Sequence, residues 1–115
     1  MMQATIEPGA EFKHNLALLP PIDGVARVDL VGDDGAIVAS IENAPGKQGS
    51  LAVYRYLGQA FASLDAAAAE HGLAVFAEHT LDARNRPGAH PNVDRLLAIA
   101  DGGAPLWIEV IAAED

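Results

Sequence analysis

The segment VARVDLVGDDGAIVASIE, residues 25–42, constrains the fold most strongly because it predicts a β-hairpin. Two runs rich in valine and isoleucine, residues that are enriched in strands, flank the turn Gly32–Gly35. Aspartate and glycine tolerate the left-handed backbone dihedrals that tight hairpin connections need. A sheet is therefore part of the fold.

Helical spacing precedes and follows this hairpin. Apolar residues in AEFKHNLALLPP recur every three or four positions, and the Pro20–Pro21 pair ends that helix. After the loop NAPGKQGS, apolar residues recur at the same spacing from Ser50 onward, and serine is a favoured N-cap residue. Asp65 is expected to cap a second, alanine-rich helical segment that ends at Gly72.

The run LAVFAE, residues 73–78, fits both a helix and a strand. We interpret it as a strand, because a helix that ends in glycine and is followed by a short apolar run is typical of an α-to-β connection. Thr80 is then expected to cap a brief turn through LDARN. Pro91 fits the first position of a helix that Gly102 and Gly103 close.

The last apolar run, APLWIEVIAA, predicts a final strand. Leu106, Ile108 and Val110 share one face of this strand, and Trp107 lies on the other. Because both faces are apolar, we interpret it as a buried central strand, with a dimer interface as the alternative.

These elements follow the order α-β-β-α-β-α-β. The fold class is therefore α+β or mixed α/β, with helices packed on a four-stranded sheet. A single domain covers residues 1–115. Residues 1–9 are expected to form a loose N-terminal tail, because they show no apolar periodicity.

Composition and charge exclude several classes of function. The net charge is −9, and only residues 46–95 balance acids with bases, so the cationic face that nucleic acid needs is missing. The chain has no cysteine, which excludes disulfides and cysteine-bound metals and is compatible with the cytoplasm. The start of the chain lacks the apolar run of a signal peptide, and no stretch is apolar enough to span a membrane. We expect a soluble cytoplasmic protein without a cofactor.

Polar residues gather in two segments, residues 43–50 and 79–95. If the second and third strands are parallel, both end at the same sheet edge, and the helices that follow direct their N-termini there. Such an edge can hold a small anion. The expected ligand-binding residues are Lys47, Gln48, Ser50, His79, Arg84, Arg86, His90 and Asn92.

Other kinds of chemistry at this edge have weaker signals. APGKQGS lacks the spacing of a nucleotide-binding phosphate loop. His79, His90 and Asp82 are weak metal-ligand candidates, since no paired helical histidine motif is present. Ser50 or Thr80 beside a histidine would supply a nucleophile, although capping explains both residues.

The motifs GSLAVY, FAEHT, DAR and PGAHPNVDRL resemble those of a small, mainly proteobacterial family that is classed as a domain of unknown function. The resemblance covers about Leu16 to Leu97 and leaves out the first residues and the acidic tail. It implies a cytoplasmic, bacterial, single-domain protein and adds no activity.

We therefore interpret the chain as a non-enzymatic binding or interaction module. Its site would hold a small anion or an acidic partner segment between Asn43–Ser50 and His79–Arg95. A metal- or histidine-assisted hydrolase at the same edge is the alternative. A homodimer is also a candidate, whereas nucleic acid and membranes are not expected partners.

Overall fold

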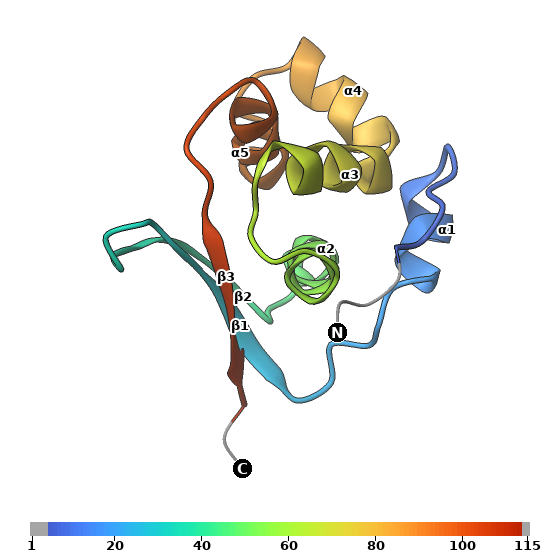
Figure 1. Cartoon of the computed structure of the whole chain (residues 1–115). Helices are drawn as coiled ribbons and strands as arrows, with labels where there is room; N and C mark the ends of the chain where they lie inside the picture. Colours follow the sequence, from blue (N-terminus) through green and yellow to red (C-terminus); the bar gives the residue numbers. More distant parts are fainter. Residues whose placement is uncertain (1–4, 114–115) are drawn as a thin grey trace.

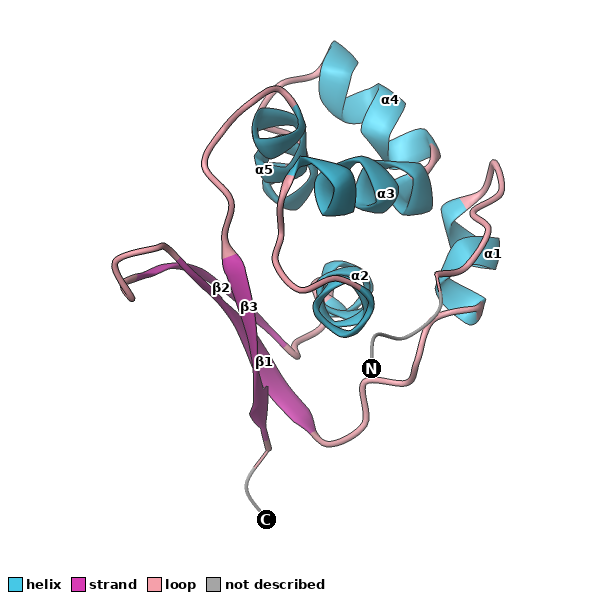
Figure 2. Cartoon of the chain, viewed as in Figure 1, coloured by secondary structure: helices cyan, strands magenta, loops and turns pink. Residues whose placement is uncertain are grey.

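The computed structural model describes residues 5–113, which form an α+β fold with a three-stranded antiparallel sheet. Figure 1 shows helices on one face of this sheet only, and Figure 2 separates the helical layer from the strands. None of the described helices is long and apolar enough to cross a membrane. In chain order the elements are α1 (Phe12–Ala17), β1 (Val25–Val31), β2 (Ile37–Glu42), α2 (Gln48–Ala60), α3 (Ala66–Phe76), α4 (Glu78–Asn85), α5 (Pro91–Ala100) and β3 (Trp107–Ala112).

The predicted hairpin is confirmed. β1 and β2 pair antiparallel, with Val28 opposite Ile41. Gly35 has a φ of +86°, a left-handed conformation that glycine adopts without strain. The Gly32 N–H donates to the Ala36 carbonyl at 2.9 Å and closes the turn. The turn residues therefore act as their local chemistry predicts.

β3 completes the sheet on the other side of β1, which gives the strand order β2-β1-β3. The final strand is therefore an edge strand, and its interpretation as a buried central strand is wrong. β1 is the central strand, and its residues Val28 and Leu30 are fully buried beneath the helices. No helix within residues 5–113 covers the opposite face, where Trp107 is 41% exposed.

Residues 73–76 belong to α3 and Glu78 begins α4, with Ala77 in a turn between them at a φ of +53°, so the predicted third strand is wrong and the sheet has three strands instead of four. α3 begins at the predicted Asp65 cap, whose carboxylate accepts an N–H of the first turn at 3.0 Å. The helix continues through Gly72, where a Cβ would lie 2.9 Å from methyl carbons of Leu57 and Leu96. The glycine therefore permits close packing of three helices and does not end one.

Two predicted helix caps are also wrong. α2 begins at Gln48, two residues before Ser50, with Lys47 at the N-cap position. Thr80 lies inside α4, where its hydroxyl donates to the Leu73 carbonyl at 2.6 Å. Thr80 thus joins α4 to α3 and does not cap a turn.

Both predicted ends of α5 are confirmed. Pro91 occupies its first turn, where a missing N–H has no cost. At the other end, the N–H groups of Gly102 and Gly103 donate to the carbonyls of Ile99 and Ala98, the pattern of a Schellman motif. Gly102 has the left-handed φ, +105°, that this motif requires.

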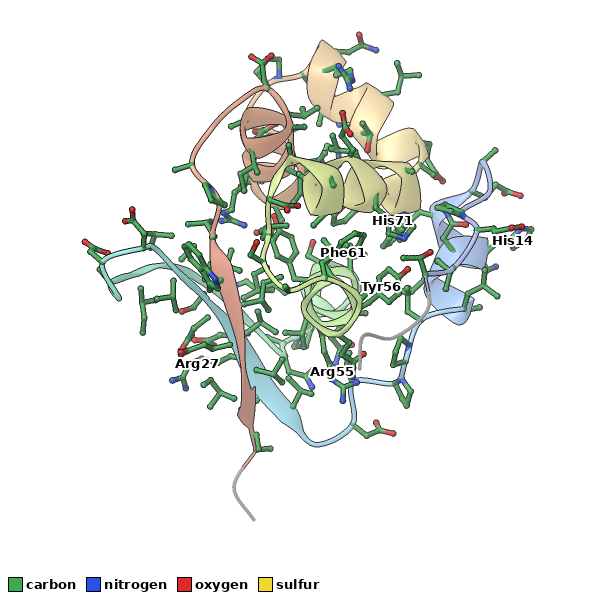
Figure 3. The ribbon with its side chains drawn as sticks, in the orientation of Figure 1. His14, Arg27, Arg55, Tyr56, Phe61 and His71 are labelled. Carbon is green, nitrogen blue, oxygen red and sulfur yellow. The ribbon has the colours of Figure 1, made fainter. Side chains whose placement is uncertain are left out.

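The first described residues are tied to the helical layer. Residues 1–4 of the expected tail lie outside the described residues, but Ile6 packs against the core and its N–H donates to the Tyr56 hydroxyl at 2.8 Å. That hydroxyl also forms a hydrogen bond with His71 Nε2 at 2.7 Å (Figure 3), in which the neutral form of the imidazole donates or accepts according to its tautomer. Burial lowers the pKa of His71 and so favours this neutral form.

A buried asparagine joins α1 to α3. Asn15 is 1% exposed, and its amide donates to the carbonyls of Gly9 and Val75 at 3.0 Å each. Its Oδ1 accepts from the Gly9 N–H at 2.7 Å. Because Val75 lies in the last turn of α3, Asn15 satisfies a carbonyl that has no partner within the helix.

Candidate functional site

A pocket of about 300 Å³ lies where the N-terminal turns of α2 and α5 approach each other. Residues 89–93, which lead into α5, form one side of it. The other lining residues come from α1, the start of α2, the end of α3 and the start of α4: Phe12, Gly46, Gly49, Ser50, Phe76 and His79.

The structure brings four of the eight predicted site residues to this pocket: Ser50, His79, His90 and Asn92. The segments 43–50 and 79–95 therefore approach each other as expected, but the expected physical reason is wrong. All pairs between the described strands are antiparallel, so no common edge of parallel strands exists there. Helix packing brings the two segments together instead.

Tyr54 fixes the first turn of α5 against α2. Its buried hydroxyl donates to the Asn92 carbonyl at 2.5 Å and accepts from the Arg95 guanidinium at 3.1 Å. Arg95 also donates to Asn92 Oδ1 at 2.9 Å. Burial raises the pKa of Tyr54 to about 12, so the hydroxyl keeps the hydrogen that it donates. The two helix ends at the pocket are thus held in a defined position.

The other four predicted residues do not line this pocket. Gln48 lines an apolar groove between α1 and α2, and its amide donates to a side chain in the preceding loop at 2.9 Å. Arg84 lines a hollow beside α3 and α5. Arg86 donates twice to Asp82. Lys47 occupies the N-cap position of α2 but makes no side-chain cap.

The two histidines of the pocket lie next to each other. The ring centroids of His79 and His90 are 5.4 Å apart. The His79 ring also meets Phe12 edge-on at 4.9 Å, and Phe12 stacks on Phe76 at 5.4 Å. One part of the wall is therefore imidazole and another part is apolar aromatic.

Sequence reasoning missed the two phenylalanines. The helical spacing of Phe12 and Phe76 marks them as core positions, and no local signal indicates that they reach a pocket. The Phe12 N–H donates to Glu78 Oε1 at 2.7 Å, which ties the start of α1 to the start of α4. This hydrogen bond holds the pKa of Glu78 below its usual range. The aromatic wall thus depends on a contact between segments far apart in the sequence.

An ion-pair network orients His90. Its Nε2 lies 2.6 Å from Asp82 Oδ2, and the same carboxylate accepts from Arg86 at 2.9 and 2.5 Å. The hydrogen bonds from Arg86 and then His90 hold the pKa of Asp82 well below its usual range. An ionised carboxylate only accepts hydrogen bonds, so Nε2 carries the hydrogen and Nδ1 is the unprotonated nitrogen of a neutral His90.

The electrostatic character of the pocket favours negative charge. The first N–H groups of a helix have no partner within the helix, and the helix dipole adds positive partial charge there. Two such ends, those of the 13-residue α2 and the 10-residue α5, meet at this pocket. Of the nearby acids, Asp82 is paired with Arg86, whereas Glu78 and Asp94 in the first turns of α4 and α5 oppose this field.

A metal centre has no donor set in the described part of the chain. No three histidine, aspartate or glutamate side chains among residues 5–113 are arranged to hold a metal ion. Of the weak candidates, Asp82 and His90 hydrogen-bond to each other, and Arg86 occupies the same carboxylate. The metal-assisted form of the predicted hydrolase therefore receives no support from this geometry.

Comparison with known families gives one match. A family model described as "Uncharacterized protein conserved in bacteria (DUF2322)" matches residues 12–110. No curated protein and no solved structure matches the chain. The matched region contains every residue that lines the pocket.

Proposed function

Because the chain belongs to this family of uncharacterised bacterial proteins, we propose a function from the pocket itself: a non-enzymatic module that binds a small anion between α2 and α5. One observation carries the proposal. The N-terminal turns of two helices and the imidazoles of His79 and His90 meet at one pocket of about 300 Å³. Unpartnered helix N–H groups and the positive end of the dipole are a common means of binding phosphate, sulfate or carboxylate.

Each part of the wall has a role in this proposal. Backbone N–H groups near Gly49 and Asn92 donate to the anion, and the Ser50 hydroxyl adds a further donor. An imidazole adds a full positive charge when it is protonated, so anion affinity rises on acidification. A carboxylate on an acidic segment of a partner protein presents the same chemistry to these groups.

Thermal unfolding with and without inorganic phosphate, sulfate or citrate tests the proposal. A ligand at 100 times its Kd stabilises a protein by about 2.7 kcal/mol. For a domain of this size, that corresponds to a Tm increase of roughly 10 °C. An acidic peptide in a parallel titration separates a partner segment from a free anion.

Matched variants locate the effect. His79→Gln and His90→Gln are expected to reduce the Tm increase, whereas His14→Gln, on the exposed surface of α1 outside the pocket, leaves it unchanged. The absence of any Tm increase, or an equal increase in all three variants, would contradict anion binding at this pocket.

The hydrogen bond between Asp82 and His90 favours one alternative, a histidine-assisted hydrolase. A carboxylate that fixes the imidazole is the usual arrangement of a general base, and Ser50 lines the same pocket. Hydrolysis of p-nitrophenyl acetate and p-nitrophenyl phosphate tests it. Turnover that is lost in His90→Gln supports this alternative, and turnover at the level of the buffer alone excludes it for these two ester classes.

We propose the cytoplasm as the compartment of this module. The chain contains no cysteine and therefore needs no oxidising environment for disulfide formation. Fluorescence microscopy of the tagged chain in a bacterial host tests this assignment.

A further inference from the structure

The outer edge of β3 is available for pairing. Backbone N–H and C=O groups along a strand point alternately to its two sides. Leu106 exchanges two hydrogen bonds with Leu64, on the side away from β1, whereas the Ala113 N–H donates to Gly24 at the end of β1. The alternation directs the groups of Ile108, and of the even-numbered residues that follow, away from β1. No other strand of residues 5–113 pairs with them.

This edge has one of the features that usually protect edge strands, the charged Glu109, and lacks the others. Charged side chains, prolines and bulges normally discourage pairing between sheets. The residues whose backbone groups face outward are Ile108, Val110 and Ala112, and none is charged or proline. By the same alternation, the outer edge of β2 presents Ser40 and Glu42, so it is more polar. β3 is therefore the edge better suited to accept another strand.

We propose that two copies of this chain pair antiparallel through β3 and form a continuous six-stranded sheet. The bridge between Leu64 and Leu106 blocks one end of the edge, so an incoming strand has only Ile108 to Ala112 available. The centre of this stretch is Val110, which is 42% exposed. A two-fold axis at Val110 places this residue opposite its own copy and Ile108 opposite Ala112.

The proposed register pairs apolar residues at its centre and sets the one acid of β3 opposite an apolar residue. It places Glu109 of one copy opposite Ile111 of the other, so no two acids lie directly opposite each other. Arg27 pairs with Ile111 in the sheet, and Figure 3 shows it on the face away from α2. Its Nε donates to Asp29. In the proposed dimer, Ile111 lies between Arg27 and Glu109 of the second copy. Arg27 therefore lies two strands, about 9–10 Å, from this acid, and its direct partner remains Asp29.

α2 is the helix that contacts β3, and the proposed register keeps the two copies of this contact apart. α2 contacts β3 at Gly58, where a Cβ would lie 2.8 Å from Ile108 Cγ2. Ile108 is two residues from the proposed axis in each copy, so the two α2 ends are offset by about 13 Å along the strands. This offset exceeds the usual distance of about 8–10 Å between packed helices. The contact points of the two α2 helices therefore stay apart in the proposed dimer.

Sedimentation velocity of the full chain over a wide concentration range tests the proposal. The expected result is a reversible increase from the 11.9 kDa monomer towards twice that mass. Amide hydrogen exchange is expected to slow at Ile108 and Val110 as the dimer forms. A chain that stays monomeric up to its solubility limit would overturn the proposal.

Three variants at one position test the register. Val110→Pro removes an outward N–H but no N–H that β1 uses, and Val110→Lys keeps the backbone but sets two positive charges opposite each other. Both are expected to shift the mass to the monomer, with unchanged far-UV circular dichroism. Val110→Thr keeps the N–H and the shape and is the matched control, which is expected to dimerise. A dimer that persists in folded Val110→Lys would refute pairing through β3.

Discussion

Replacement of Asn15 by alanine tests how α1 is attached to the rest of the fold. The side chain is 1% exposed and makes three hydrogen bonds, two with Gly9 and one with the Val75 carbonyl. Gly9 is exposed, so water replaces the lost partner there. Val75 is fully buried, and no backbone N–H outside α3 in the described residues donates to its carbonyl.

The expected loss of stability follows from these contacts. A buried carbonyl that loses its partner costs about 1–3 kcal/mol, and removal of the amide group leaves a small cavity that costs about 1 kcal/mol more. Asn15→Ala should therefore lower the free energy of unfolding by about 2–4 kcal/mol. With a urea m value of about 1.3 kcal/mol/M, the midpoint falls by about 1.5–3 M.

Urea unfolding followed by far-UV circular dichroism measures this change. Lys13→Ala, at an exposed position of the same helix, is the matched control and should stay within about 0.5 kcal/mol of the parent chain. If Asn15→Ala is as stable as Lys13→Ala, the Val75 carbonyl does not depend on Asn15 and the reasoning is refuted.

Three further predictions concern other elements. Asp65→Ala removes the side-chain cap of α3 and should cost about 1 kcal/mol, whereas Asp65→Asn should retain most of it; equal urea midpoints for the two variants would contradict the cap. Because the folded state lowers the pKa of His71, the unfolded chain binds its proton first, so stability should fall as pH drops below about 6.5. Urea midpoints at pH 7.5 and 5.5 should differ less in His71→Gln than in the parent chain, and an unchanged difference would argue against this role. Gly58→Ala sets a methyl group 2.8 Å from Ile108 Cγ2 and should lower the Tm, whereas the same change should cost less in an Ile108→Ala background, which lacks Cγ2; a stabilising Gly58→Ala would show that the contact relaxes freely.

Local chemistry made part of this fold predictable. Three of its features depend only on residues close in the sequence and can therefore be predicted from it. They are the Asp-Gly turn of the hairpin, the proline at the start of α5 and the glycines at its end. Gly72 shows the limit of such reasoning. A glycine after an alanine-rich helix resembles a C-cap, but its role depends on Leu57 and Leu96, which lie in other helices.

The candidate site shows the same limit. Sequence reasoning placed Ser50, His79, His90 and Asn92 together, but it relied on parallel strands that the sheet does not contain. The apolar pattern of a single helix does not predict which other helix its end will contact. Phe12 was missed for that reason, because it reaches the pocket from an element about 65 residues before its Glu78 partner.

The central position of β1 has a consequence for the order of folding. Val28 pairs on one side with Ile41 and on the other with Val110, so one neighbour is 13 positions away and the other 82. Closing the longer loop costs more entropy and slows its formation, so we expect the hairpin to form early and β3 to join last. Until then β1 exposes an unpaired edge. A peptide with the sequence of β3, added during refolding, should compete for this edge and lower the yield of native protein.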